Sequence, residues 1–140
     1  MKIGPFLLTP CALVLDRETS LEEWEGPVRS LEAMQRSINW WLGDAVVRGE
    51  ELFGDDVFQV FSDGVSVDLL TRCATVSREF PMAERNLALS WTHHFAVCGL
   101  PKPLQRALLS KAAVNNWGSG EFREHLAKLK RVSKEGGASA

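Results

Sequence analysis

Residues 56–80 read DVFQVFSDGVSVDLLTRCATVSREF, and they divide into two helical patterns around an Asp-Gly pair. Two aspartates, residues 55 and 56, are typical of the start of a first helix, expected to end at about Ser62. Glycine accepts positive φ, so Asp63-Gly64 predicts a turn. Ser66 is expected to cap a second helix over residues 67–79. Helix, turn and helix within about 25 residues is the order of a helix-turn-helix.

The second of these helices has two chemically different faces. Its apolar positions, expected to face inward, are Leu69, Leu70, Cys73, Ala74 and Val76. A helix that reads the major groove needs polar and basic side chains on the other face. Here that face holds Ser66, Asp68, Thr71, Arg72, Thr75 and Arg78. Arg72 suits a guanine edge or a phosphate, whereas Asp68 opposes phosphate unless it accepts a hydrogen bond from a cytosine amino group.

The first 54 residues predict an arm and a tryptophan-rich helical segment. Residues 2–17 are expected to be extended, because two prolines interrupt them. Ser20 and Glu23 have the spacing of a capping box, and apolar residues then recur at steps of three and four. Gly26-Pro27 predicts a short helix followed by a long one that ends before Gly54. The three tryptophans of this segment are expected in the core or in a subunit interface.

The C-terminal part predicts three more helices. They are expected from Trp91 to Cys98, from the prolines at 101 and 103 to about Asn115, and from Ser119 onward. The predicted organisation is an extended arm (1–19), an oligomerisation segment (20–54), a helix-turn-helix domain (55–132) and a flexible tail (133–140). The fold class is therefore all-α, with a short extended N-terminal arm.

Composition narrows the class of protein. The chain is 45% hydrophobic and 24% charged, which is ordinary for a globular protein in water. Its three cysteines have no metal-binding or disulfide spacing, which favours a reducing cytoplasm and no metal. The apolar N-terminal stretch is too short and too interrupted for a signal peptide or a membrane span.

Charge is divided unevenly along the sequence. Residues 1–64 hold 12 acidic and 5 basic side chains, and residues 65–140 hold 6 acidic and 11 basic ones. The second half is suited to a polyanion, although a chance fluctuation gives the same pattern. Its basic residues indicate either a surface that follows phosphates or a solvated helix face. The basic residues that the C-terminal helices contribute are Lys102, Arg106, Lys111, Arg123, Lys128, Lys130, Arg131 and Lys134.

Residues 89–97, LSWTHHFAV, resemble the L-S-x-x-H-x-x-A/V helix that follows the helix-turn-helix of ParB-like and KorB-like partition and repressor proteins. Residues 117–121, WGSGE, are similar to the W-S-x-x-E start of that family's last helix, with Gly118 in place of the serine. The tryptophan-rich segment WWLGD at 40–44 resembles small actinobacterial, phage- or plasmid-borne members. The resemblance covers about residues 20–130 and implies binding to double-stranded DNA.

The resemblance also has limits. The nucleotide-binding domain of partition proteins is absent, so CTP-dependent clamping is not implied. The groove helix is less basic than in strong DNA binders, which leaves open a helix-turn-helix kept only for packing.

The adjacent histidines 93 and 94 need separate roles. Neighbouring residues of a helix point about 100° apart, so the two rings do not share one site. In the family-like interpretation one histidine packs under the helix-turn-helix and the other approaches phosphate. Thr92, His93 and Arg123 therefore join the expected DNA contacts. Cys98 is expected to be a small core residue and His125 a surface residue.

The sequence thus predicts a cytoplasmic, nucleoid-associated DNA-binding protein. Its role is that of a transcriptional regulator or a partition-type accessory of a phage or mobile element, acting as a homodimer through residues 20–54. The alternative is a phage or host interaction or packaging adaptor that uses the helix-turn-helix as scaffold. No enzyme is expected, with no catalytic residue, metal or cofactor, because no phosphate loop, paired carboxylates or nucleophile constellation is present.

Overall fold

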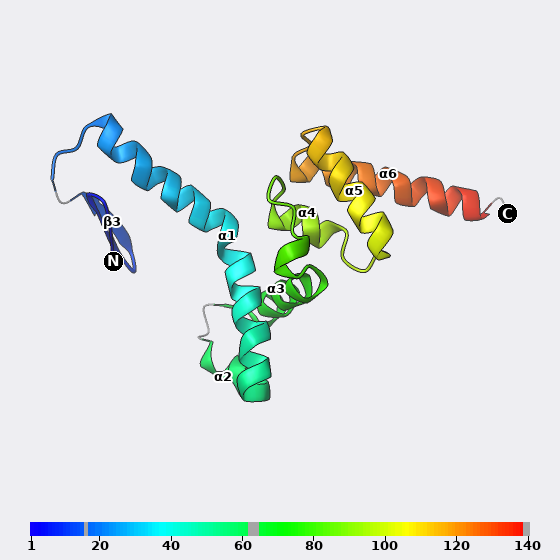
Figure 1. Cartoon of the computed structure of the whole chain (residues 1–140), viewed down its shortest axis with the longest axis horizontal. Coiled ribbons are helices and arrows are strands. Elements are labelled where there is room, and N and C mark those ends of the chain that lie inside the picture. Colours follow the sequence, from blue (N-terminus) through cyan, green and yellow to red (C-terminus); the bar gives the residue numbers. More distant parts are fainter. Residues whose placement is uncertain (16, 62–64, 139–140) are drawn as a thin grey trace. The chain divides into compact units, whose positions relative to one another are not determined.

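The computed structural model describes residues 1–15, 17–61 and 65–138, with side chains up to residue 133. It is mostly helical, with a small antiparallel sheet at the N-terminus (Figure 1). The chain forms two compact units, Met1–Ile38 and Asn39–Ala140, which are described separately below. None of the described helices is long and apolar enough to cross a membrane.

The expected N-terminal arm is a three-stranded antiparallel sheet, which corrects the all-α assignment. Its strands are β1 (Lys2–Ile3), β2 (Phe6–Thr9) and β3 (Ala12–Leu15), in the order β1-β2-β3. Gly4, at φ +54°, lies in the first turn, and Phe6 pairs with both Ile3 and Leu15. The two proline-containing segments act as turns, so the strands satisfy one another's backbone groups.

A single helix, α1 (Leu21–Phe53), follows the sheet. Ser20 caps it as predicted, because Ser20 Oγ accepts the Glu23 N–H at 3.2 Å. The predicted break at Gly26-Pro27 is wrong, and Pro27 lies inside the helix. Proline costs the helix one backbone hydrogen bond there, while its ring packs beside the sheet: a Cβ on Gly4 would lie 2.9 Å from Pro27 Cγ.

The next helices confirm one predicted cap and correct another. A 3-10 turn, η1 (Gly54–Asp56), leads into α2 (Val57–Val60), and Asp56 makes no side-chain capping bond. α2 is also shorter than expected, because Phe61 is already extended. α3 (Val67–Glu79) has the predicted bounds, and Ser66 Oγ accepts the Leu69 N–H at 3.1 Å. The predicted Asp63-Gly64 turn lies outside the described residues.

The remaining elements are η2 (Met82–Glu84), α4 (Trp91–Ala96), α5 (Lys102–Val114) and α6 (Ser119–Ala138). Gly99, at φ +88°, and Asn116, at φ +52°, lie in the turns before α5 and α6. α6 continues to Ala138, through residues that were expected to form a tail. Its second half extends beyond the neighbouring helices (Figure 1).

Two apolar clusters form the core of the second unit. The larger one joins α3 to α4, α5 and α6, and its members are Cys73, Val76, Phe80, Trp91, Val97, Leu109, Ala112, Phe122 and Leu126. The smaller one, of Val46, Val57, Leu70 and Ala74, joins α1 and α2 to α3. The inward face of α3 is therefore as predicted, with Leu69 half-buried.

α1 and α3 approach each other at a glycine. A Cβ built on Gly43 would lie 2.3 Å from the Cys73 carbonyl oxygen and 2.3 Å from Ser77 Oγ. Only a residue without a side chain allows this backbone contact.

The tryptophans of α1 divide between the core and the surface. Trp40 packs against the larger cluster, whereas the exposed fractions of Trp24 and Trp41 are 42% and 52%.

Candidate nucleic-acid interface

The polar face of α3 is open to solvent. Six predicted contact residues lie exposed on one side of this helix or at its N-cap: Ser66, Asp68, Thr71, Arg72, Thr75 and Arg78. Their exposure follows from the packing of the opposite side into both apolar clusters. The structure therefore brings these residues together on a continuous surface.

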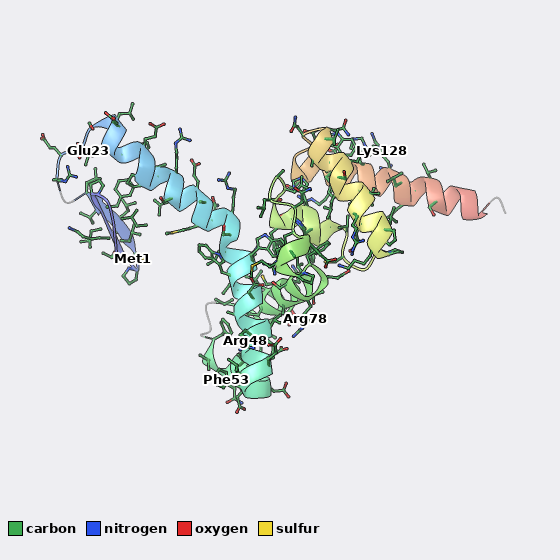
Figure 2. All side chains as sticks on the ribbon, viewed as in Figure 1. Met1, Glu23, Arg48, Phe53, Arg78 and Lys128 are labelled. Atoms are coloured by element: carbon green, nitrogen blue, oxygen red, sulfur yellow. The ribbon has the colours of Figure 1, made fainter. Side chains whose placement is uncertain are left out.

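The two arginines of this face differ in their surroundings. Arg78 lies beside the C-terminal part of α1 (Figure 2), and its guanidinium pairs with Glu50. Arg72 forms no ion pair or hydrogen bond with the residues that the structure describes. Thr75 Oγ1 donates to the Thr71 carbonyl at 2.9 Å, which leaves its oxygen free to accept. Arg72 is thus the basic group of this face with full freedom to contact a ligand.

The structure does not place His93 on that surface. The residue is buried, with an exposed fraction of 6%. His93 Nδ1 accepts the Ser90 N–H at 3.1 Å, and Nε2 lies 2.8 Å from the Trp117 carbonyl. Because Nδ1 accepts a backbone proton, Nε2 carries the ring proton and donates it to Trp117 O. His93 therefore completes a capping box at α4 and holds the turn before α6, and it is not available to phosphate.

The other predicted contacts lie elsewhere. Thr92 is half-buried on α4, and Arg123 is exposed on α6. His125, expected at the surface, is half-buried and stacks on Trp117 with ring centroids 3.8 Å apart. The spacing Ser90-x-x-His93 is the capping-box spacing with histidine in the last position, so the sequence contained the signal for this role.

His94, the next residue of α4, points about 100° away from His93 and is also buried. Its Nδ1–H donates to the Ser90 carbonyl at 2.7 Å, and Nε2 accepts the Asn86 N–H at 3.1 Å. Trp40 and Phe80 both meet the ring edge-on, with centroids 5.0 Å away. Burial lowers the pKa of His94 below its usual 6.5, and the nearby charges of His93 and Arg85 lower it further, although the Ser90 carbonyl acts in the other direction.

The neutral state of His94 predicts a pH dependence of stability. The unfolded chain takes up this proton near pH 6.5, whereas the folded chain takes it up only at lower pH. The contribution of His94 to the free energy of unfolding is therefore constant above about pH 7 and falls as the pH drops below about 6.5, by up to about 1.4 kcal/mol per pH unit. Urea titrations at half-unit pH steps measure this slope. His94→Gln retains a donor and an acceptor, and it should be less stable at pH 8 but lose this slope. An unchanged slope in the variant would assign the effect to other groups.

A half-buried arginine connects α1 to the end of α3. Arg85 donates to both carboxylate oxygens of Asp44, at 2.9 and 2.7 Å, and its Nε donates to the Phe80 carbonyl at 2.8 Å. The guanidinium also lies over the Trp40 ring, 4.2 Å from its centroid. Hydrogen bonds from Arg85 hold the pKa of Asp44 below its usual value. No local pattern indicates a pair 41 residues apart, so the sequence interpretation missed it.

The C-terminus of α3 is fixed by the carboxylate of Glu79. Its Oε1 accepts the Gly99 N–H and Gln105 Nε2–H, each at 2.7 Å. Burial raises the pKa of Glu79, but these hydrogen bonds, with those from Cys98 and the charge of Lys102, outweigh it and leave the pKa below its usual value. Burial and the adjacent Glu79 raise the pKa of the Cys98 thiol to about 12. The thiol therefore stays protonated, which fits the expected packing role and not a nucleophile.

The comparisons with known proteins add one observation. The chain resembles a transcriptional regulator. It is 30% identical over 115 residues to the transcriptional regulator NovE of Streptomyces niveus, an alignment that covers 81% of this chain and 53% of that protein. The chain thus spans about half the length of this curated relative. No family model and no solved structure matches the chain, so the resemblance to ParB-like and KorB-like proteins stays a prediction.

Proposed function

We propose that this protein is a transcriptional regulator that binds double-stranded DNA, with α2 and α3 as a helix-turn-helix and α3 as the groove-reading helix. The observation that carries the proposal is the polar face of α3, which is exposed over its whole length while the opposite face is packed in the core. The name of the Streptomyces relative supports a regulatory role.

The contacts divide by their chemistry. Arg72 and the two threonines Thr71 and Thr75 are positioned for base edges, and Ser66 at the N-terminus of α3 for a phosphate. Asp68 selects a cytosine amino group at its position. The exposed basic residues of α6 supply phosphate contacts outside the groove; they are Arg123, Lys128, Lys130 and Arg131.

We propose that the DNA-bound form is a homodimer and that its interface lies in residues 20–54. A single small helix-turn-helix unit provides little contact area, and dimers read two half-sites. Exposed apolar side chains of α1 support this choice, since Leu21, Trp24, Ile38 and Trp41 remain uncovered within one chain.

Fluorescence anisotropy with duplex DNA tests the proposal. Arg72→Gln should weaken binding about tenfold, the loss expected for one base or phosphate contact. Arg106→Gln is the matched control, because Arg106 is also exposed but lies on α5, outside the proposed interface, and pairs with Glu84. If Arg72 contacts a phosphate, the salt dependence of binding also decreases by about one unit.

Two results would contradict this assignment. Absence of binding at micromolar protein in low salt would remove the DNA function and favour the adaptor alternative. Equal losses in Arg72→Gln and Arg106→Gln would show a general charge effect and exclude α3 as the reading helix. Enrichment of genomic fragments by the protein then measures whether binding is sequence-specific.

A further inference from the structure

The strand β3 lies at an edge of the N-terminal sheet, and one of its two sides has no neighbouring strand. The strand order is β1-β2-β3, so β3 pairs with β2 alone. All residues of β3 are exposed. The exposed fractions of Leu13, Val14 and Leu15 are 45%, 46% and 47%. The free edge of β3 is therefore open to solvent.

The hydrogen bonds of the sheet identify which backbone groups point out of this free edge. The Leu8 N–H donates to the Met1 carbonyl at 2.8 Å, and the Met1 amino group donates to the Leu8 carbonyl at 3.2 Å. The backbone of Leu8 thus faces β1, and Leu8 makes no backbone bond to Leu13, its partner on β3. The N–H and C=O groups of Leu13, and of Leu15 two residues later, therefore point away from β2. Among the described residues, no group outside the sheet bonds them.

The free edge also lacks the usual protection against another strand. Natural sheets protect their edges with lysine, proline or a bulge. The described strand has none of these, because it reads ALVL and pairs with β2 in a continuous register. Leu13 and Leu15 share a face with the buried Phe6, and Val14 lies on the other face. Both faces of the edge are thus apolar, which suits the addition of a further strand.

The sequence of β3 favours a second copy of this chain as the added strand. Leu13-Val14-Leu15 reads the same in both directions and carries no charge that would oppose its own copy. In an antiparallel pair with a two-fold axis at Val14, each Leu13 lies opposite the Leu15 of the other chain. The outward N–H and C=O groups of both leucines then find partners. The same register places Val14 opposite its own copy, in a pair that is not hydrogen-bonded.

We propose that two copies of the chain pair through β3 and join their three-stranded sheets into one continuous antiparallel sheet. Backbone hydrogen bonds form in both Leu13–Leu15 pairs, and these leucines make one apolar row on the face of Phe6. The contact lies outside the dimer interface proposed for residues 20–54. It does not rest on DNA binding either, so each proposal can fail without the others.

Disulfide cross-linking of Val14→Cys in the full chain tests the contact. The Cα atoms of a non-hydrogen-bonded antiparallel pair lie about 4.5 Å apart, a distance that a disulfide spans. Cys11 is exposed, so Cys11→Ser is present in every variant and alone gives the baseline. Leu7→Cys is the matched control, because Leu7 is also 37% exposed but lies on the central strand β2.

The measured quantity is the rate at which the covalent dimer forms in a glutathione buffer. One short strand is a small contact, so about 0.2 mM protein is used. Val14→Cys should cross-link at least about tenfold faster than Leu7→Cys, because pairing of the strands raises the local concentration of the thiol. Adding Arg72→Gln should leave this rate unchanged, which separates the contact from DNA binding.

Two changes at Leu13 test whether the free backbone edge is responsible. Leu13→Pro removes the outward N–H, and proline is tolerated where the N–H of an edge strand faces solvent. Leu13→Lys keeps this N–H and places a charge in the apolar row. Either change should slow cross-linking of Val14→Cys at least about fivefold. Thermal melting confirms that each variant is folded, and Leu13→Lys decides the test if Leu13→Pro unfolds.

Two results would overturn the proposal. Equal cross-linking rates in Val14→Cys and Leu7→Cys would mean that β3 does not pair with a second copy and that its edge serves a different protein or none. An unchanged rate in a folded Leu13→Lys variant would mean that the cysteines meet through another surface.

Discussion

Gly43→Ala lowers the free energy of unfolding by about 2–4 kcal/mol, or prevents folding of the second unit. The new methyl group would lie 2.3 Å from the Cys73 carbonyl oxygen and 2.7 Å from its carbonyl carbon. These are backbone atoms of α3, which cannot move aside without displacing the helix. Alanine stabilises a helix relative to glycine by about 1 kcal/mol at most, so the destabilising effect of the clash is larger.

Urea unfolding followed by tryptophan fluorescence measures this loss. Gly120→Ala is the matched control, because Gly120 also lies in a helix of the second unit and its added Cβ has no atom within 4 Å. That variant should be neutral or slightly more stable. Equal stability of Gly43→Ala and Gly120→Ala would mean that α1 and α3 do not approach as described.

Glu79→Ala should lower the free energy of unfolding by about 2–4 kcal/mol. It removes the oxygen that accepts from both Gly99 and Gln105, and the Gln105 amide is completely buried. Glu79→Gln keeps an acceptor oxygen and should cost about 1 kcal/mol. Glu79→Gln removes the charge and keeps an acceptor oxygen, whereas Glu79→Ala removes both. The difference between their free energies of unfolding therefore measures the contribution of the hydrogen bonds.

Chemical denaturation at pH 7 checks both Glu79 variants. Glu124→Ala, which removes an exposed carboxylate from α6, should change the free energy of unfolding by less than about 0.5 kcal/mol. A loss of similar size in Glu124→Ala would point to overall charge and against the local contacts of Glu79.

The sequence predicted best where the determinants are local. The bounds of α3 follow from Ser66 and from the residues before Pro81, and its two faces follow from the helical period. Local rules failed where a tertiary contact decides the outcome. Pro27 stays within α1 because it packs beside Gly4, and the N-terminal strands form a sheet because each supplies the others' backbone partners.

The candidate site shows the same division. The polar face of α3 was predictable as a face, but the partner of Arg78 was not, because Glu50 lies 28 residues away in the sequence. The resemblance predicts a DNA contact for His93, but in the structure its Nδ1 completes a capping box with Ser90 and its Nε2 bonds the Trp117 carbonyl, 24 residues away. The spacing of residues along the sequence thus predicts which face of a helix a side chain lies on. Contacts with residues far away in the sequence determine whether that side chain is free to bind a ligand.

The capping box of Ser90 and His93 has a consequence for how related sequences should vary. The pair works because a side-chain oxygen at one position and an acceptor three residues later each satisfy a backbone N–H group. Homologues that keep α4 should therefore change the two positions together, with threonine or aspartate at 90 and glutamate or glutamine at 93. Such coupled substitution would mark the S-x-x-H signature as the beginning of a helix, and a search for relatives should accept those replacements.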